Sequence, residues 1–447
     1  MPHPAPALRT ALLAVPLVLP VLSVLSGAPA TAAPPAPGAA AAAATCEGRP
    51  ATVIGEPGQG LLRGTPGPDV VVSGGARSVQ TYGGDDLVCV DVHPADLAPV
   101  VRTGDGADRV VVTSTEARGV RAVLGRGADT FVGGPGGDQV GTGTVEAGGT
   151  SPDRDAGRDV VETRGGDDAV QVGGATMRDT ARLGDGDDRV FVAARRAGTG
   201  AWLQGGAGRD EVVAWGPRSS AVRPSQPVVV DNGRGVATRA GARWWRFGGL
   251  EGFDLSAASG SVTFRGSGAA ESLVVDRPAS LEADLGPGRD AVRMLAPVRG
   301  ARLAAGPGRD RLDLRGAGDA DVDLGLGRAR VGSASAVTRS FADLGLVVSG
   351  DARFRGTDQP NSLRVVACSI DAAGLGGADA LEIVPATDDE LLPDCRRRGT
   401  LRGGPGADVL VGSLRDDVLL GGPGRDSAAG GRGSDLCRAE RRVGCER

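Results

Sequence analysis

The stretch that decides the fold is GGPGADVLVGSLRDDVLLGGPGRDSAAGGRGSDLC, residues 403–437. An aspartate recurs here every nine residues, at Asp408, Asp417, Asp426 and Asp435. Each aspartate follows a glycine-rich run and precedes a short, mostly apolar run. Nine residues is not a helical period, and glycine at this density destabilises a helix. The stretch therefore predicts tight turns that alternate with short β-strands.

The same glycine-rich turn recurs along most of the chain. Further copies end at Asp69, Asp86, Asp108, Asp129, Asp138, Asp159, Asp168, Asp188, Asp210, Asp290 and Asp310, and weaker copies lie near Asn361 and Asp379. Asp86 and Asp108 are 22 residues apart, and Asp290 and Asp310 are 20 apart. A recurrence near twenty residues is typical of a solenoid in which each period forms one coil.

The runs between the turns, such as VVVTS, have the length and composition of strands. With 75 glycines and only 3% aromatic residues in 447, the chain favours a thin, repetitive core. We therefore predict an all-β fold, a parallel β-solenoid (right-handed β-helix or β-roll) of about 18–22 residues per coil. In residues 403–437 each coil consists of two nonapeptides, with one turn at each edge.

The turn aspartates need a role beyond the fold. Stacked coils place equivalent turns about 4.8 Å apart, so Asp408 and Asp426 share one edge, and Asp417 and Asp435 the other. Two carboxylates at about 5 Å repel by about 3 kcal/mol at an effective dielectric constant near 20. Calcium binds six to eight oxygens and suits carboxylates that are joined by backbone carbonyls, whereas magnesium requires a stricter octahedron.

Two alternatives to a metal ion remain open for the aspartates. A glycine-rich turn with a capping aspartate is ordinary turn chemistry. Arginines also directly precede the aspartate in several turns, at Arg158, Arg209, Arg289, Arg309 and Arg425. Ion pairs with these arginines are the alternative counter-charge, although exposed pairs contribute only about 0–1 kcal/mol.

The segment GGPGADVLV, residues 403–411, matches the pattern G-G-x-G-x-D-x-U-x, in which U is a large apolar residue. In this respect the chain resembles the RTX, or haemolysin-type, calcium-binding repeat proteins. The resemblance implies a parallel β-roll with Ca²⁺ between turns one coil apart. It implies one ion at Asp408 and Asp426 and another at Asp417 and Asp435, and the same ligand role is expected for the upstream turn aspartates. The turn glycines of the first site are Gly404, Gly406, Gly422 and Gly424.

The C-terminal match is specific, and the upstream copies are degenerate. In GSLRDD, Arg415 replaces a turn glycine, which weakens the expected Asp417 site. Between Asp210 and Asp290 only relics remain, such as GGLEGFDLS and GSGAAESLVV. There we expect the coil to persist without metal.

Targeting and cysteine content indicate export. Residues 1–32 have the pattern of a signal peptide, with Arg9, an apolar run and a small-x-small site that ends at Ala32. A Pro/Ala-rich spacer (33–45), a degenerate solenoid (46–399) and a C-terminal RTX-like block (400–447) are expected to follow. No second long apolar segment appears, so no membrane span is expected.

Six cysteines fit an oxidising compartment, and pairing of sequence neighbours (Cys46 with Cys89, Cys368 with Cys395, Cys437 with Cys445) is one of 15 connectivities.

The predicted function is that of a secreted calcium-binding repeat protein with a structural or interaction role. A net charge of −5 does not favour nucleic-acid binding. Enzymatic activity is not expected, because only His3 and His93 exist and no metalloprotease or nucleophile-elbow motif occurs. The alternative is a carbohydrate-binding or carbohydrate-active β-helix. Its candidate surface would include Trp202, Trp215, Trp244, Trp245, Phe247 and Phe253, since strand alternation would turn Trp244 away from Trp245. The stronger interpretation is core packing, because aromatic residues gathered in one zone commonly thicken the interior where coils widen.

Overall fold

The computed structural model describes residues 44–92, 97–144, 146–147, 155–174, 177–192, 200–214, 226–384, 395 and 398–446. The predicted signal peptide, most of the predicted spacer, His93 and Trp215 lie outside these residues. Within them every regular element longer than a single turn is a β-strand, as predicted. A short antiparallel hairpin, β1 (Thr45–Cys46) and β2 (Arg49–Pro50), precedes the coils.

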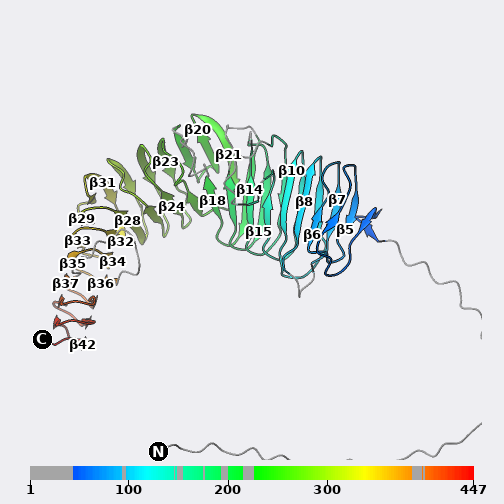
Figure 1. Cartoon of the computed structure of the whole chain (residues 1–447). Coiled ribbons are helices and arrows are strands. Elements are labelled where there is room, and N and C mark those ends of the chain that lie inside the picture. The colour runs from blue at the N-terminus through cyan, green and yellow to red at the C-terminus, as the bar shows by residue number, and fades with distance from the viewer. Residues whose placement is uncertain are drawn as a thin grey trace, which may run out of the picture. The chain divides into compact units, whose positions relative to one another are not determined.

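After this hairpin the chain alternates between two long sheets, called sheet 1 and sheet 2 (Figure 1). Sheet 1 contains, in spatial order, β3 (Val53–Ile54), β5 (Val70–Val72), β7 (Leu87–Val90), β9 (Arg109–Val112), β11 (Thr130–Val132), β13 (Val160–Glu162), β15 (Thr180–Asp185), β17 (Trp202–Ala207), β21 (Ala242–Gly248), β20 (Val236–Arg239), β19 (Val228–Asp231), β23 (Ser261–Arg265), β25 (Ser280–Asp284), β27 (Ala301–Ala304), β31 (Ala334–Arg339), β30 (Arg328–Val331), β29 (Ala320–Asp323), β33 (Ala352–Thr357), β35 (Ser369–Leu375), β37 (Arg398–Arg402), β39 (Val418–Leu420) and β41 (Leu436–Arg438).

Sheet 2 contains β4 (Leu62–Arg63), β6 (Ser78–Gln80), β8 (Val100–Asp105), β10 (Arg121–Arg126), β12 (Gln139–Gly141), β14 (Ala169–Val172), β16 (Arg189–Val192), β18 (Glu211–Ala214), β22 (Gly252–Asp254), β24 (Ser272–Val275), β26 (Ala291–Met294), β28 (Asp310–Gly316), β32 (Phe341–Val348), β34 (Ser362–Val366), β36 (Ala380–Ile383), β38 (Val409–Val411), β40 (Ser427–Ala429) and β42 (Arg441–Val443). All strands of sheet 2 pair in parallel in this order, and each successive strand comes from the next coil along the chain.

The register confirms that one sequence period is one coil. Leu87 of β7 pairs with Arg109 of β9, and Val409 of β38 pairs with Ser427 of β40. These partners are 22 and 18 residues apart, the two spacings expected from the turns. The predicted parallel β-solenoid is therefore correct. The coils also continue across residue 400, because β37 pairs with both β35 and β39.

Two coils contain strands that the sequence pattern did not predict. Strands β19, β20 and β21 form an antiparallel meander in sheet 1, while β18 pairs directly with β22 in sheet 2. Strands β29, β30 and β31 repeat this arrangement while β28 pairs directly with β32. Each of these coils thus gives three strands to sheet 1 and one to sheet 2.

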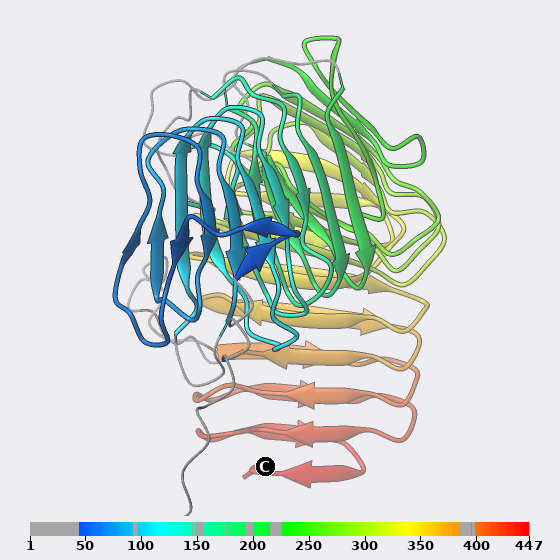
Figure 2. The same cartoon turned by 90° about the vertical axis from the view of Figure 1, so that its right-hand side faces the viewer.

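The main core is a thin column of mostly small apolar side chains between the sheets. A smaller, separate apolar cluster consists of Cys46, Val70, Leu87 and Cys89. Inward residues stack on their equivalents, as where Phe131 pairs with both Val110 and Val161. The C-terminal coils are short and flat (Figure 2). There the column has one buried residue per strand, such as Leu410 in β38 and Ala428 in β40. A core this thin can therefore be filled with few aromatic residues.

The core interpretation of the aromatic zone holds for Trp244 and Trp245, and the alternative, in which one of them faces solvent, is wrong. Both side chains are buried, with 2% and 1% exposed. A β-bulge is the cause: Ala237 pairs with Trp245 and Thr238 with Arg243, so Trp244 is an extra residue that escapes the alternation. Both indoles belong to the continuous apolar core, with their ring centroids 4.2 Å apart.

Three disulfides join the cysteines that are neighbours in sequence. Cys46 is bonded to Cys89, Cys368 to Cys395, and Cys437 to Cys445. The first ties the N-terminal hairpin to β7, and the last closes the C-terminal end of the stack. Of the 15 connectivities that the sequence left open, the structure has the neighbour pairing.

Candidate metal sites

The turn aspartates stack into three ladders, each at the edge of a sheet and directly before its strands. Ladder 1 precedes sheet 1 strands and contains Asp69, Asp86, Asp108, Asp129, Asp159 and Asp179. Ladder 2 precedes sheet 2 strands and contains Asp138, Asp168, Asp188, Asp210 and Glu251, then Glu271, Asp290 and Asp310, then Asn361, Asp379, Asp408, Asp426 and Glu440. Ladder 3 lies on the sheet 1 edge near the C-terminus and contains Asp417, Asp435 and Glu446. All the aspartates in these ladders are buried.

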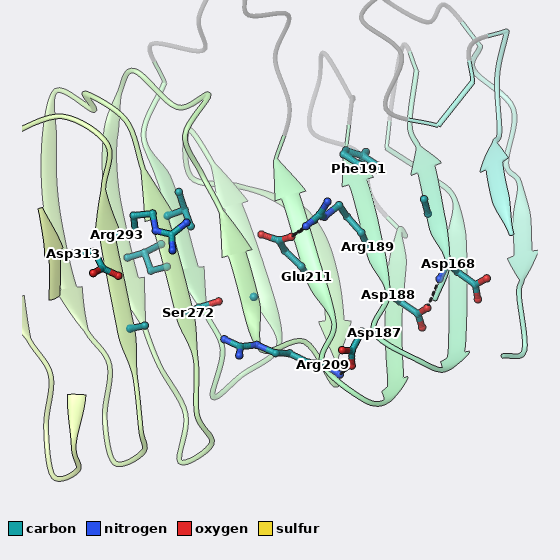
Figure 3. A pocket seen from close by; sticks show the side chains of 15 residues that line it. Asp168, Asp187, Asp188, Arg189, Phe191, Arg209, Glu211, Ser272, Arg293 and Asp313 are labelled. Atoms are coloured by element: carbon teal, nitrogen blue, oxygen red, sulfur yellow. Dashed lines mark hydrogen bonds and ion pairs between the residues drawn. The ribbon is translucent and has the colours of Figure 1, made fainter. Parts of the chain in front are cut away.

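One hydrogen bond repeats along each ladder. The backbone N–H of one acid donates to a carboxylate oxygen of the equivalent acid one coil later, as from Asp168 to Asp188 at 2.8 Å (Figure 3). The corresponding distances are 2.8 Å from Asp69 to Asp86, 2.9 Å from Asp408 to Asp426 and 2.8 Å from Asp417 to Asp435. The stacking of Asp408 with Asp426 and of Asp417 with Asp435 on opposite edges is therefore as expected.

The second carboxylate oxygen has no hydrogen-bond partner in most of these turns. It folds back over the first residue of its own turn, so that a Cβ on Gly403 would lie 2.2 Å from Oδ2 of Asp408. Buried Oδ2 atoms without a partner occur at Asp86, Asp108, Asp129, Asp138, Asp159, Asp168, Asp188, Asp210, Asp290, Asp310, Asp379, Asp408, Asp426 and Asp435. A buried carboxylate oxygen without a donor is strongly unfavourable unless a cation or a proton balances it.

Backbone carbonyls of one turn face the glycines of the equivalent turn one coil later in the C-terminal coils. Gly404 and Gly406 have φ of 116° and 157°, and Gly422 and Gly424 have φ of 112° and 154°. The carbonyl oxygens of Gly404 and Gly406 point at the α-carbons of Gly422 and Gly424, where a Cβ would lie 2.4 Å and 1.5 Å away. Carboxylate and carbonyl oxygens form a hard donor set of the kind that calcium prefers.

The electrostatics also call for a counter-charge. Burial, with neighbouring acids, raises the pKa of Asp129 to about 8 and that of Asp159 to about 9. Burial likewise raises the pKa of Asp168 to about 8 and that of Asp138 to about 7. The fully ionised ladders are therefore costly when no cation is bound.

Arginines do not provide that counter-charge in the part of the chain that is described. Arg309, which precedes Asp310, pairs instead with Asp343 at 3.1 Å. No ion pair among the described residues joins an arginine to a ladder aspartate. Nor do these residues contain a group of three or more His, Cys, Asp or Glu side chains placed to hold a metal ion. A cation here would therefore be held by a few carboxylates together with backbone carbonyls.

An outer row of acids accompanies ladder 2 beside a groove on sheet 2. The groove has a volume of about 540 Å³ and is lined by Asp168, Asp187, Asp188, Arg189, Arg209 and Glu211, among others (Figure 3). Asp187 accepts a 2.9 Å hydrogen bond from the backbone N–H of Arg209, and Arg189 forms an ion pair with Glu211 at 2.7 Å. Asp187, the exposed acid next to the ladder residue Asp188, thus also accepts a hydrogen bond from the backbone of the next coil.

Sequence reasoning missed several ladder members. Asp179, 20 residues after Asp159, had the right spacing, but its turn lacks the glycine pattern. Glu251 and Glu271 lie in the relic turns, in the region where no metal was expected. The Glu251 carboxylate accepts from the N–H of Asp210, and the N–H of Glu271 donates to the Asp290 carboxylate, so both residues extend ladder 2. Glu440 and Glu446 end the ladders only 14 and 11 residues after Asp426 and Asp435. The longer glutamate side chain reaches across these irregular coils, which a fixed period does not reveal.

Comparison with known proteins agrees with this geometry. No curated protein matches the chain. The segment that contains Asp408, Asp417, Asp426 and Asp435 does match a family model. Residues 402–437 match the RTX calcium-binding nonapeptide repeat in four copies, so the C-terminal coils are similar to the repeats of that family.

Proposed function

We propose that this protein is an exported, non-catalytic calcium-binding repeat protein whose coils are completed and held together by Ca²⁺ between stacked turns. The observation that carries the proposal is the row of buried Oδ2 atoms without partners, which includes those of Asp408 and Asp426 in the RTX segment. A cation is the simplest partner for a buried oxygen that no donor reaches.

The best-supported site lies at the sheet 2 edge of the C-terminal coils. Asp408 and Asp426 would supply carboxylate oxygens, and the turns that contain Gly404, Gly406, Gly422 and Gly424 would supply carbonyl oxygens. The other ladder aspartates with an unpartnered Oδ2 are further candidates. Bound calcium would supply positive charge and oxygen coordination, and magnesium fits less well because it requires a regular octahedron.

The arrangement of the ladder carboxylates explains why folding would depend on calcium. The ladder carboxylates are buried and lie close to one another, so the apo coils carry an electrostatic cost that grows with each stacked turn. Ligands that bind only the folded state stabilise it in proportion to the logarithm of their concentration. A chain that meets little calcium before export and much calcium afterwards would thus complete its coils outside the cell.

Three disulfides support an extracellular location, because such bonds persist in oxidising compartments. In the described part of the chain there is no helix with the length and apolarity needed to cross a membrane. The carbohydrate-active alternative would be favoured by a solvent-facing cleft with acids beside Trp244 or Trp245, and both of these side chains are buried. Trp202 is half-buried, with the Arg246 guanidinium 5.4 Å from its ring centroid.

The decisive experiment is a calcium titration of the mature protein, followed by calorimetry and far-UV circular dichroism, with magnesium in parallel. We expect saturable calcium binding and a higher melting temperature, both reduced in the variant Asp408→Ala with Asp426→Ala. The matched control is Asp284→Ala with Asp321→Ala, which removes two exposed strand aspartates outside the ladders. No response to millimolar calcium in the wild-type protein would refute the proposal.

A further inference from the structure

The turns divide into two chemical kinds according to their second residue, which lies four positions before the turn acid. In four turns this second residue is Ser or Thr, namely Thr65, Ser267, Thr357 and Ser413. In the turns whose Oδ2 has no partner the second residue is never Ser or Thr, and in most of them it is glycine.

In all four Ser/Thr turns this residue binds the acid or amide at the end of its own turn. The Ser413 backbone N–H donates to Oδ2 of Asp417 at 2.5 Å, and its hydroxyl donates to the same oxygen at 2.8 Å. The corresponding N–H distances are 2.6 Å for Thr65 with Asp69, 2.5 Å for Ser267 with Glu271 and 2.7 Å for Thr357 with Asn361. The hydroxyl distances are 3.1 Å, 2.5 Å and 3.2 Å in the same order.

The hydroxyl also closes the turn on its other side. The Ser413 hydroxyl oxygen accepts a 3.1 Å hydrogen bond from the N–H of Arg415, and equivalent bonds reach Thr65, Ser267 and Thr357. Each Ser/Thr turn therefore provides two donors to one side-chain oxygen of its terminal residue. Asp69 and Asp417 accordingly have no unpartnered Oδ2, whereas the longer Glu271 side chain keeps one bare oxygen, Oε2.

The backbone conformation accompanies this division. In twelve of the fourteen turns with a bare Oδ2 the second residue has positive φ, at Tyr82, Gly104, Gly125, Arg164, Gly184, Gly206, Gly286, Gly306, Leu375, Gly404, Gly422 and Gly431. The two exceptions are Gly134 and Asp155, in the turns that end at Asp138 and Asp159. None of the four Ser/Thr residues has positive φ. With positive φ the N–H of Gly404 donates to the carbonyl of Gly421 in the next coil at 2.8 Å, whereas the N–H of Ser413 turns inward to its own carboxylate.

Asn361 shows that a Ser/Thr turn does not require a charged acid. Its Oδ1 accepts from Thr357, and its Nδ2 donates to the carbonyl of Ala342 at 2.9 Å. A neutral amide thus fills the position completely without a counter-charge. A cation therefore has no bare side-chain oxygen to neutralise in this turn.

We propose that Ser or Thr at the second position of a turn that ends in aspartate takes over the role of calcium, because its N–H and hydroxyl bind the carboxylate oxygen that the ion would otherwise bind. The C-terminal coils therefore bind calcium at the sheet 2 edge, whereas the Asp417 turn at the sheet 1 edge is closed without calcium. This inference rests on the proposed function for the first edge and adds which turns are metal sites. Asp435 retains a bare Oδ2, but the Asp417 carboxylate next to it in ladder 3 is already occupied by Ser413.

Hydrogen exchange of the full mature chain, in chelator and in calcium, tests the division directly. We expect calcium to slow exchange at residues 403–408 and 421–426 and to leave residues 412–417 unchanged. Equal protection of residues 412–417 by calcium would overturn the inference. Absence of a calcium effect at every turn would instead refute the proposed function itself.

Variants of Ser413 supply a second arm that does not depend on calcium. In chelator, Ser413→Ala should speed exchange of the Arg415 amide at least about tenfold, since a hydrogen bond that holds a charged network is lost. Ser413→Thr keeps the hydroxyl and should retain slow exchange, and Ser427→Ala is the matched control. Unchanged exchange in Ser413→Ala would contradict the hydroxyl's role.

The converse variant converts the turn. Ser413→Gly with Arg415→Gly restores the glycines of the repeat pattern and should raise the calcium stoichiometry in a calorimetric titration by one ion per chain. Circular dichroism would verify that the variant is folded. A folded variant with the wild-type stoichiometry would overturn the inference.

Discussion

The backbone N–H of Asp408 donates a 2.9 Å hydrogen bond to Oδ1 of Asp426, the equivalent residue of the next coil. Each ladder aspartate is thus the acceptor for the coil before it, while its second oxygen faces its own turn. The same carboxylate links neighbouring coils and creates the candidate metal site. Stability and calcium binding are therefore coupled at the level of single residues.

Removal of one ladder carboxylate should destabilise the fold even without calcium. In Asp168→Ala the N–H of Asp138 loses its acceptor, which costs about 1–3 kcal/mol for a buried donor. Asp168→Asn keeps an oxygen there and should cost less in chelator. Urea denaturation in EDTA checks this order, and an equal loss of stability in the two variants would contradict the ladder's role.

The first glycine of the turn should be irreplaceable for steric reasons. A Cβ on Gly421 would lie 2.2 Å from Oδ2 of Asp426, so Gly421→Ala should weaken both calcium binding and stability in calcium. Gly60→Ala is the control, because a Cβ there meets no atom within 4 Å. Calorimetric titration and thermal melting of both variants provide the measurement. Similar behaviour of the two variants would argue against the Oδ2 position.

Stability without calcium should fall as the pH rises. The folded-state pKa values of Asp129 and Asp159, about 8 and about 9, exceed the ordinary value of 3.8, because burial disfavours the charged form. Their stabilising contribution is therefore complete below about pH 4 and is lost as the pH rises through the folded-state values. Melting temperatures in chelator between pH 5 and 9 should decline, and calcium should flatten the decline. The variant Asp129→Asn with Asp159→Asn should show a weaker pH dependence in chelator.

The aromatic cluster should act as core and not as a ligand surface. Phe253 is fully buried, with ring centroids 5.5 Å from Phe247 and 5.1 Å from Phe264. Phe253→Ala should therefore cost about 3–5 kcal/mol in chemical denaturation. Leu97→Ala, at a position 82% exposed, should cost little. A stable Phe253→Ala variant would reopen the question of what the aromatic residues do.

Much of the fold was readable from the spacing of particular residues. Asp129 and Asp138, nine residues apart, lie on opposite edges, whereas Asp168 and Asp188, 20 apart, stack on one edge. This was predictable because in a solenoid each coil contacts only its neighbours, so the sequence period equals the structural period. The C-terminal site followed for the same reason.

The exceptions depended on contacts that no local period encodes. The inward turn of Trp244 required a bulge opposite Ala237, within a meander whose strands pair out of sequence order. The role of Glu251 depended on its reach to the N–H of Asp210 across 41 residues. Such contacts arise only when distant segments have already come together.

The sequence by itself determined the repeating turn, the length of a coil, the two edges and the acids that line them, because these properties belong to one period and its nearest neighbour. Only the tertiary structure decided which carboxylate oxygens are buried without a partner, since that depends on whether the second turn residue directs its N–H and hydroxyl to its own acid. Gly404 and Ser413 occupy the same place in the repeat, yet one N–H bonds to the next coil and the other to its own aspartate. Gly404 has positive φ and Ser413 does not, and correspondingly Oδ2 of Asp408 has no partner whereas Oδ2 of Asp417 is hydrogen-bonded.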